Sequence, residues 1–309
     1  MHPRHRLPRP RQSSYPFPWP RHARALTIAL LAACAAVTAA CRPRGTAPEP
    51  VLIANGTTGD GLHYEISGQG RAVVLVHGTA LDLRVWDPQM PALRPRFFVV
   101  RYDQRSHGES AMQTRRSRAY EDLGNLLDTL GISSVSLVGL SSGAAVAVDF
   151  ALAYPRRVEK LVLVAPTVNG YAPTERPAWQ GELAQSVRAG DADRAALLFA
   201  NSPLMTLQDS GSARFVRQIV LENAKLWRDT IGPPQPLEPP AWGRLRELRV
   251  PLLVVVGAND VADVRHVADS LTAAVPRAQQ VLIPDAGHIV NVAAAGSFND
   301  LLVSFLGRP

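Results

Sequence analysis

Cysteine is nearly absent from this chain of 309 residues. The two cysteines present, Cys34 and Cys41, both lie within residues 1–41. The rest of the chain can therefore form no disulfide and use no thiol as a nucleophile or redox group. Chemistry in the folded part must come from other side chains.

An excess of positive charge is also missing from the main part of the chain. The sequence has 33 basic and 26 acidic residues, but six of the basic ones lie within residues 1–41, which leaves 27 against 26. Nucleic-acid binding needs a basic face on the folded domain, so this balance argues against a nucleic-acid partner. Arg115, Arg116 and Arg118 are better explained as the solvent-exposed face of a helix.

The third absence concerns metal and cofactor sites. His63, His77, His107 and His266 show none of the spacings by which a helix presents two ligands to one metal ion. We therefore expect neither a metal ion nor a cofactor.

The N-terminal region is typical of an export signal. Residues 1–24 carry six arginines and no acidic residue, and residues 25–41 are uncharged and dominated by Ala and Leu. A charged segment followed by an apolar one of this length favours a signal over a transmembrane helix. The proline-rich residues 42–50 predict a tether. We expect an exported protein of the cell envelope, with secretion, a soluble periplasmic form or an uncleaved anchor as alternatives.

Either cysteine of this region is a candidate for lipidation. Leu31-Ala32-Ala33-Cys34 and Thr38-Ala39-Ala40-Cys41 both resemble the lipobox of bacterial lipoproteins. The leucine favours Cys34, whereas the unbroken apolar stretch and the arginines that follow it favour Cys41. Several acyl chains would hold the protein at a membrane, because each buried methylene contributes about 0.8 kcal/mol.

A serine stands between two glycines directly after an apolar run. Residues 135–138 predict a buried strand, and Gly139-Leu140-Ser141-Ser142-Gly143 follows them. A chain that leaves a strand and enters a helix within two residues strains its middle residue and leaves no room for side chains two positions away, which explains Gly139 and Gly143. The following helix would point its N-terminal amides toward Ser141, the candidate nucleophile.

Two later loops carry the acid and the base that such a serine needs. A hydroxyl requires a histidine base, and the histidine requires a carboxylate that fixes its tautomer. Residues 252–256 predict a buried strand that leads to Asp260, with Asp263 close enough to compete for the role. Residues 280–284 predict another strand, followed by His288. We expect Asp260 and His288 to complete a triad with the serine.

An earlier strand end offers amides for an oxyanion hole. The apolar run before His77 and Gly78 predicts a strand, and the glycine lets the backbone amide of Thr79 or Ala80 turn inward. The amide of Ser142 would be the other donor.

Strand-like and helix-like stretches alternate along the remaining residues, about 260 in number, which is enough for one α/β domain with an insertion. Expected strands begin near Val51, Leu62, Val73, Phe97, Val135, Leu161, Leu252 and Val281. This alternation predicts a mostly parallel, eight-stranded sheet flanked by helices. The core would comprise residues 51–166 and 245–309. Residues 167–244 would form a helical cap between the sixth and seventh strands.

A cap at the C-terminal ends of the strands would cover the triad and shape an apolar pocket. Leu204, Met205, Phe215 and Trp227 are candidates to line this pocket. Ordinary core packing explains each of these side chains at least as well.

From about Val51 to Leu306 the chain resembles the α/β-hydrolase superfamily, in its capped single-domain branch of esterases, lactonases, carbon–carbon bond hydrolases and haloperoxidase-like enzymes. The resemblance rests on the ordered serine, acid and histidine loops and on residues 101–110, which are similar to the family's Asp-x-Arg-Gly-x-Gly-x-Ser loop. The chain departs from the family pattern at three places. Ser106 stands where the family usually has glycine, Ala144 where many members have a second glycine, and no glutamate follows His288.

The resemblance implies the α/β-hydrolase fold, and the serine at the turn implies acyl-enzyme chemistry. We expect a serine hydrolase that cleaves a small-molecule ester, thioester or lactone, with an apolar acyl group as the partner of the site. Two alternatives stay open. One is a cofactor-free perhydrolase or haloperoxidase-like reaction on the same triad, and the other is a non-catalytic, surface-anchored binding lipoprotein.

Overall fold

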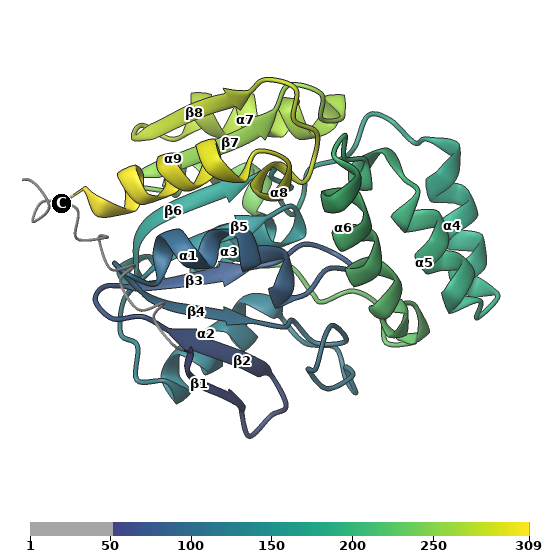
Figure 1. Cartoon of the computed structure of the whole chain (residues 1–309), viewed down its shortest axis with the longest axis horizontal. Helices are drawn as coiled ribbons and strands as arrows, with labels where there is room; N and C mark the ends of the chain where they lie inside the picture. The colour runs from purple at the N-terminus through teal and green to yellow at the C-terminus, as the bar shows by residue number, and fades with distance from the viewer. Residues whose placement is uncertain (1–51, 309) are drawn as a thin grey trace, which may run out of the picture. The chain divides into compact units, whose positions relative to one another are not determined.

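The computed structural model describes residues 52–308 (Figure 1). The expected export signal, the tether and the candidate lipidation sites Cys34 and Cys41 lie outside the described residues. Among the helices of residues 52–308, none combines the length and the apolar character needed to cross a membrane.

An eight-stranded sheet forms the centre of the described part of the chain. Its strands are β1 (Leu52–Thr57), β2 (His63–Ser67), β3 (Ala72–Val76), β4 (Phe98–Tyr102), β5 (Val135–Leu140), β6 (Val158–Val164), β7 (Leu252–Gly257) and β8 (Ala278–Ile283). The spatial order is β1-β2-β4-β3-β5-β6-β7-β8. β2 pairs antiparallel with β1 and β4, and the other pairs are parallel. The prediction of a mostly parallel, eight-stranded sheet is confirmed.

Helices cover both faces of the sheet, as Figure 1 shows. On one face α1 (Met90–Leu93) packs against α9 (Ala295–Gly307), and on the other lie α2 (Ala119–Thr129), α3 (Ser142–Ala153) and α7 (Ala262–Ala274). A parallel sheet covered on both faces needs strands that are apolar along their whole length. β5 and β7 meet this need, because every residue in them is buried.

Shorter helical turns complete the core. They are η1 (Leu83–Gln89), η2 (Pro155–Arg157), η5 (Ala241–Glu247) and α8 (Val290–Ala293). Because parallel strands end at one edge of the sheet, the loops that follow β3, β5, β7 and β8 converge there.

A helical segment separates β6 from β7. It contains α4 (Ala178–Arg188), α5 (Ala192–Ala200), η3 (Pro203–Met205), α6 (Ser210–Glu222) and η4 (Ala224–Arg228). Aspartate side chains start two of these helices: Asp191 accepts from the amide of Arg194, and Asp209 from that of Ser212. Figure 1 shows α4, α5 and α6 grouped at one end of the sheet; we call this segment the cap.

Two strands begin before their apolar runs. β6 starts at Val158 rather than Leu161, and β8 starts at Ala278 rather than Val281. The early part of β6 contains Lys160, a buried lysine whose ammonium donates to carbonyls at the C-terminal end of α9. β8 lies at the sheet edge, where polar residues are tolerated and the apolar signal is weak.

Candidate functional site

Ser141 lies at the sharp turn between β5 and α3, with φ 54° and ψ −117°. Such a backbone conformation costs a residue with a side chain about 1–3 kcal/mol. Two glycines make the turn possible. A Cβ on Gly139 would lie 2.4 Å from the carbonyl oxygen of Gly143, and a Cβ on Gly143 would lie 2.2 Å from that of Val76. The turn is therefore packed directly against the end of β3.

The loops after β7 and β8 bring a histidine and a carboxylate to this serine. Nε2 of His288 lies 2.9 Å from Ser141 Oγ. Nδ1 of the same ring lies 3.1 and 3.0 Å from the two carboxylate oxygens of Asp260. His288 is 2% exposed and Asp260 is 5% exposed, so water does not screen their interaction. The hydroxyl, the imidazole and the carboxylate stand in series.

Asp263, the competing carboxylate, is engaged elsewhere. Its Oδ1 accepts from the hydroxyls of Tyr171 and Thr174, each at 2.7 Å. Asp260 in turn accepts the amide of Val261 at 2.7 Å, which fixes its carboxylate in place. Of the two aspartates, only Asp260 meets His288.

The loop after β3 passes beside the serine, and a Cβ on Gly78 would lie 3.2 Å from Ser141 Cβ. Thr79 Oγ1 donates to Ser142 Oγ at 3.0 Å, so the two residues are neighbours. Among residues 52–308, neither the amide of Thr79 nor that of Ser142 has a hydrogen-bond acceptor. Two free amides next to a candidate nucleophile are the donors that an oxyanion would require.

The expectation for Ala80 needs a correction. Its amide donates to Nε2 of His107 at 3.2 Å and is therefore not free for an oxyanion. Of the two candidate oxyanion donors in this loop, only Thr79 keeps an amide that is free of any acceptor in the described part of the chain.

His77 and His107 join the loop after β3 to the loop after β4. Nδ1 of His77 donates to the carbonyl of Gly78 at 2.8 Å, and its Nε2 accepts the amide of Gln104 at 2.9 Å. His107 uses its Nδ1 in the same way, toward the carbonyl of Arg105 at 2.8 Å. Burial lowers the pKa of His77 and lowers that of His107 to about 3. Both rings are thus neutral and can accept an amide proton.

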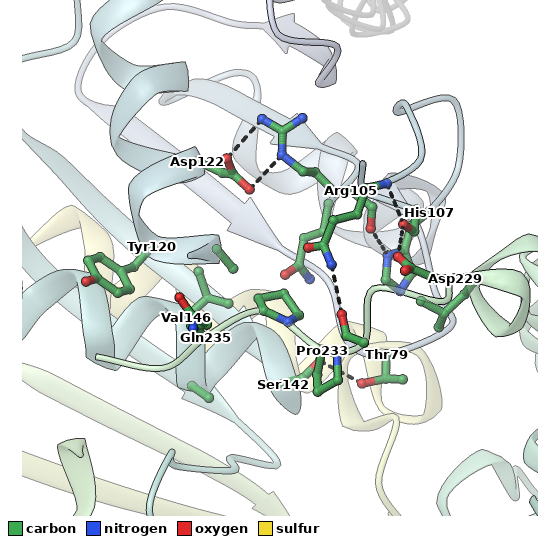
Figure 2. Close-up of a pocket in the computed structure, with 18 of the residues that line it drawn as sticks. Thr79, Arg105, His107, Tyr120, Asp122, Ser142, Val146, Asp229, Pro233 and Gln235 are labelled. Carbon is green, nitrogen blue, oxygen red and sulfur yellow. Dashed lines mark hydrogen bonds and ion pairs between the residues drawn. The ribbon is translucent and has the colours of Figure 1, made fainter. Parts of the chain in front are cut away.

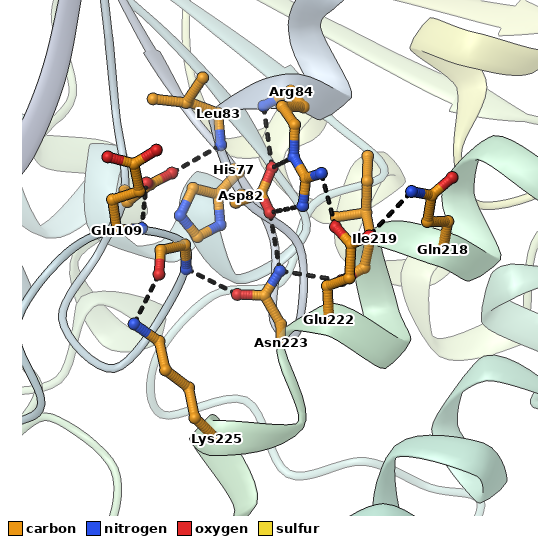
Figure 3. A network of polar contacts seen from close by, with 12 residues as sticks. His77, Asp82, Leu83, Arg84, Glu109, Gln218, Ile219, Glu222, Asn223 and Lys225 are labelled. Atoms are coloured by element: carbon orange, nitrogen blue, oxygen red, sulfur yellow. Dashed lines mark hydrogen bonds and ion pairs between the residues drawn. The ribbon is translucent and has the colours of Figure 1, made fainter.

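A polar network attaches the cap to these loops (Figure 3). Asn223, at the end of α6, donates to Asp82 at 2.8 Å and accepts the amide of Gly108 at 2.6 Å. Arg84 lies between Asp82 and Glu222, at 2.7 and 2.6 Å. Burial alone would raise the pKa of Asp82, but the hydrogen bonds from Arg84 and Asn223 lower it. The carboxylate therefore stays charged and orders the base of the cap.

A cavity of about 410 Å³ opens beside Thr79 and Ser142, as Figure 2 shows. Its apolar lining includes Leu62, Tyr102, Tyr120, Val146, Leu226 and Trp227. The charged side chains in its wall are partly neutralised, since Arg105 pairs with Asp122 at 2.9 Å. A cavity of this size and lining suits a small organic molecule.

Of the four cap residues that were candidates for the lining, Trp227 lines this cavity. Met205 belongs to the buried core, and Leu204 and Phe215 pack against it. Within the part of the chain that the structure describes, no group of three or more His, Cys, Asp or Glu side chains could hold a metal ion.

Three residues with structural roles were not predicted from the sequence: His107, Asn223 and Asp229. Each acts through a contact with a residue far away in the chain: Asn223 and Asp82, for example, are 141 positions apart. His107 lies within residues 101–110, which resemble a loop of the family, and this resemblance could have pointed to it. For Asn223 and Asp229 the sequence contains no local pattern that marks them.

Comparison with known proteins places this geometry in a family. A model of the alpha/beta hydrolase fold family matches residues 71–294. A Bacillus subtilis (strain 168) protein, provisionally named a 2-succinyl-6-hydroxy-2,4-cyclohexadiene-1-carboxylate synthase, is 27% identical over 82% of this chain and 97% of its own. The pimeloyl-acyl-carrier-protein methyl ester esterase of Nitrosomonas europaea is 29% identical over 74% of this chain and 92% of its own.

A solved structure agrees with these matches. The enol-lactonase of Burkholderia xenovorans LB400 superposes with a TM-score of 0.68 at 25% identity, over 82% of this chain and 100% of that chain. Since the family model spans well over half of the sequence, the chain belongs to the alpha/beta hydrolase fold family and is an enzyme of the hydrolase type.

Proposed function

We propose that this protein is a serine hydrolase that cleaves a small-molecule ester, thioester or lactone through an acyl-enzyme. The observation that carries the proposal is the unbroken series of contacts from Ser141 Oγ through His288 to Asp260. Ser141 is the nucleophile, His288 is the general base and acid, and Asp260 orients the imidazole.

The first half-reaction forms the acyl-enzyme. His288 Nε2 takes the proton of the Ser141 hydroxyl while Oγ attacks the substrate carbonyl carbon. The amides of Thr79 and Ser142 donate to the oxyanion of the tetrahedral intermediate. His288 then returns its proton to the leaving alcohol, thiol or lactone oxygen as the carbon–oxygen or carbon–sulfur bond breaks.

The second half-reaction releases the acid. A water molecule gives a proton to His288 and attacks the acyl carbon, and the resulting intermediate collapses with return of the proton to Ser141 Oγ. Because Asp260 holds Nδ1 throughout, Nε2 always faces the reacting atoms.

The cavity beside Thr79 and Ser142 supports an apolar acyl group. Its lining is mainly aliphatic and aromatic, and it begins at the residues that would hold the oxyanion. The named activities of the esterase and lactonase relatives are carboxylic ester reactions, which agrees with this substrate class.

The proposal extends to the location of the protein. A basic segment, an apolar segment and two lipobox-like cysteines favour export, followed by attachment of lipid to Cys34 or Cys41. The enzyme would then act at the surface of a membrane of the cell envelope.

The test compares two adjacent serines. Ser141→Ala removes the nucleophile and should lower kcat for a p-nitrophenyl ester by about 10⁴-fold or more. Ser142→Ala keeps the backbone amide and loses only the contact with the Thr79 hydroxyl, so its kcat should fall by about tenfold at most. Circular dichroism checks that both variants fold.

Labelling by a fluorophosphonate probe should occur in the wild type and in Ser142→Ala and disappear in Ser141→Ala. Equal losses of activity in the two variants, or labelling that persists in Ser141→Ala, would contradict the assignment. A wild type that is neither labelled nor active would point to the binding lipoprotein instead.

A further inference from the structure

One wall of the cavity is a short piece of chain that leads out of the cap. Residues 229–235, here called the strap, follow η4. Asp229, Gly232, Pro233, Pro234 and Gln235 line the cavity. Pro233, Pro234 and Gln235 are also exposed to solvent, so this part of the wall is a single chain thick. Figure 2 draws Pro233 near Ser142 and Gln235 near Val146 among the residues that line the cavity.

The strap is held by a few contacts, and they come from the loop after β4 and from the segment that follows it. Ser106 Oγ donates to Asp229 Oδ2 at 2.7 Å. Gln113 Nε2 donates to the carbonyl of Gly232 at 2.8 Å. Farther along, the amide of residue 235 donates to the carbonyl of Ser117 at 2.8 Å. The two prolines between these points have no amide hydrogen to contribute.

Ser106 makes one of these contacts directly and supports a second. Besides donating to Asp229, its hydroxyl accepts the amide of Gln113 at 3.0 Å, and Gln113 is the residue that binds Gly232. Ser106 is 1% exposed, so both bonds are shielded from water. One hydroxyl thus sets the position of the first half of the strap.

The backbone at Ser106 makes this arrangement costly. Its φ is +65°, in the left-handed region that glycine adopts freely and other residues avoid. A glycine would adopt this backbone conformation without strain but would carry no hydroxyl. Strained residues cluster at functional sites, so the hydroxyl kept at this position is a candidate for a functional role.

The opposite side of the cavity is rigid by comparison. Ala119 and Tyr120 of α2 and Ala145 and Val146 of α3 line it, and both helices pack in the core. A larger substrate group would therefore displace the thin strap more easily than these two packed helices.

Resting on the proposed function, we propose that Ser106 and Asp229 form a clamp that holds the strap over the cavity and limits the size of the acyl group the enzyme accepts. Ser106 also lines the cavity. It is a positioning residue in this arrangement, because its hydroxyl acts through the strap. The substrate class that follows is esters of short, compact acids.

The test uses the full-length protein with three substitutions. Ser106→Gly removes the hydroxyl and relieves the strained backbone, and Asp229→Ala removes its acceptor. Ser134→Ala is the matched control, because its hydroxyl binds Glu159 far from the strap. Each protein is examined by hydrogen–deuterium exchange and by kinetics on p-nitrophenyl esters of increasing acyl length.

Both clamp variants should exchange the non-proline amides of the strap at least about fivefold faster, with β5 unchanged. For both, the ratio of kcat/KM on long esters to that on short esters should rise at least about fivefold, with the change in KM rather than in kcat. The control should match the wild type in both measurements. An unchanged acyl-length profile in Ser106→Gly and Asp229→Ala overturns the proposal, whatever the exchange rates.

The exchange measurement separates this proposal from the proposed function. If the wild type hydrolyses no ester, the proposed function fails, and the clamp is judged by exchange alone. Faster exchange of the strap in the variants then supports the clamp, and unchanged exchange overturns it.

Discussion

Two buried histidines determine how the loops around the serine are placed. His77 accepts the amide of Gln104, and His107 accepts the amide of Ala80. Both contacts require a neutral ring, because a protonated imidazole has no acceptor nitrogen. Burial provides this by lowering both pKa values. Because the amide of Ala80 donates to His107, the amide of Thr79 is the one of these two that stays free beside Ser141.

This neutral state predicts a pH dependence of stability. In the unfolded chain a histidine binds a proton near pH 6.5, whereas folded His107 does so near pH 3. Between these values the unfolded state binds more protons, so His107 reduces the free energy of unfolding by about 1.4 kcal/mol for each pH unit of acidification.

A His107→Gln variant lacks this titration, and its side chain can still accept an amide proton. From pH 7 to pH 5 the wild type should lose about 2 kcal/mol more of its free energy of unfolding than this variant does. Urea unfolding at both pH values measures the difference. A constant gap between the two proteins would show that the fold does not lower the pKa of His107.

At the scale of elements, the turn between β5 and α3 depends on the contact of a helix with a neighbouring strand. Gly143, in the first turn of α3, lies so close to β3 that a Cβ would come within 2.2 Å of one backbone oxygen and 2.5 Å of the next. Backbone cannot move aside as a flexible side chain does. The same contact sets the distance between Ser141 and the loop of Thr79.

Gly143→Ala should therefore destabilise the protein by about 1–3 kcal/mol and lower kcat, since the two amides move apart. The matched control is Gly181→Ala in α4, where a Cβ meets nothing within 4 Å. That variant should be neutral or more stable by up to about 1 kcal/mol, because alanine favours a helix. Thermal unfolding and ester kinetics compare them, and equal behaviour of the two would contradict the packing argument.

The whole molecule combines a folded part with an N-terminal region of different composition. The buried core and the candidate site both lie within residues 52–308, whereas both cysteines lie before them. The proposed lipidation of Cys34 or Cys41 is tested by metabolic labelling.

Growth of a bacterial host with an alkynyl fatty acid should label the wild-type protein. Replacing the acylated cysteine, by Cys34→Ser or Cys41→Ser, should abolish the label and release the protein from the membrane fraction. Ser141→Ala serves as the control, with labelling unchanged. Labelling that survives in the double cysteine variant, or is absent from the wild type, would contradict lipidation.

Much of the fold was predictable because the sheet is buried on both faces. The strands β3 and β7 contain no polar side chain and β5 contains only Ser136, and their hydrophobic runs predicted them near their observed bounds. The start of β6 was not predictable, since Lys160 is polar in sequence and is buried only through its bonds to α9. The start of β8 was missed because an edge strand needs fewer apolar residues.

The features of the candidate site also fall into two groups, those that local sequence predicted and those that tertiary contacts decided. Local sequence determined the turn at Ser141, the two glycines beside it and the order of Asp260 and His288, because strand ends and tight turns depend on residues close together in the chain. The sequence favoured Asp260 over Asp263, but only tertiary structure shows Asp260 in contact with His288 and shows that Thr79, rather than Ala80, keeps a free amide. Tertiary structure also decided that Ser106 reaches Asp229, 123 positions away. These are choices between groups of the same chemistry, and only the packing of distant segments distinguishes them.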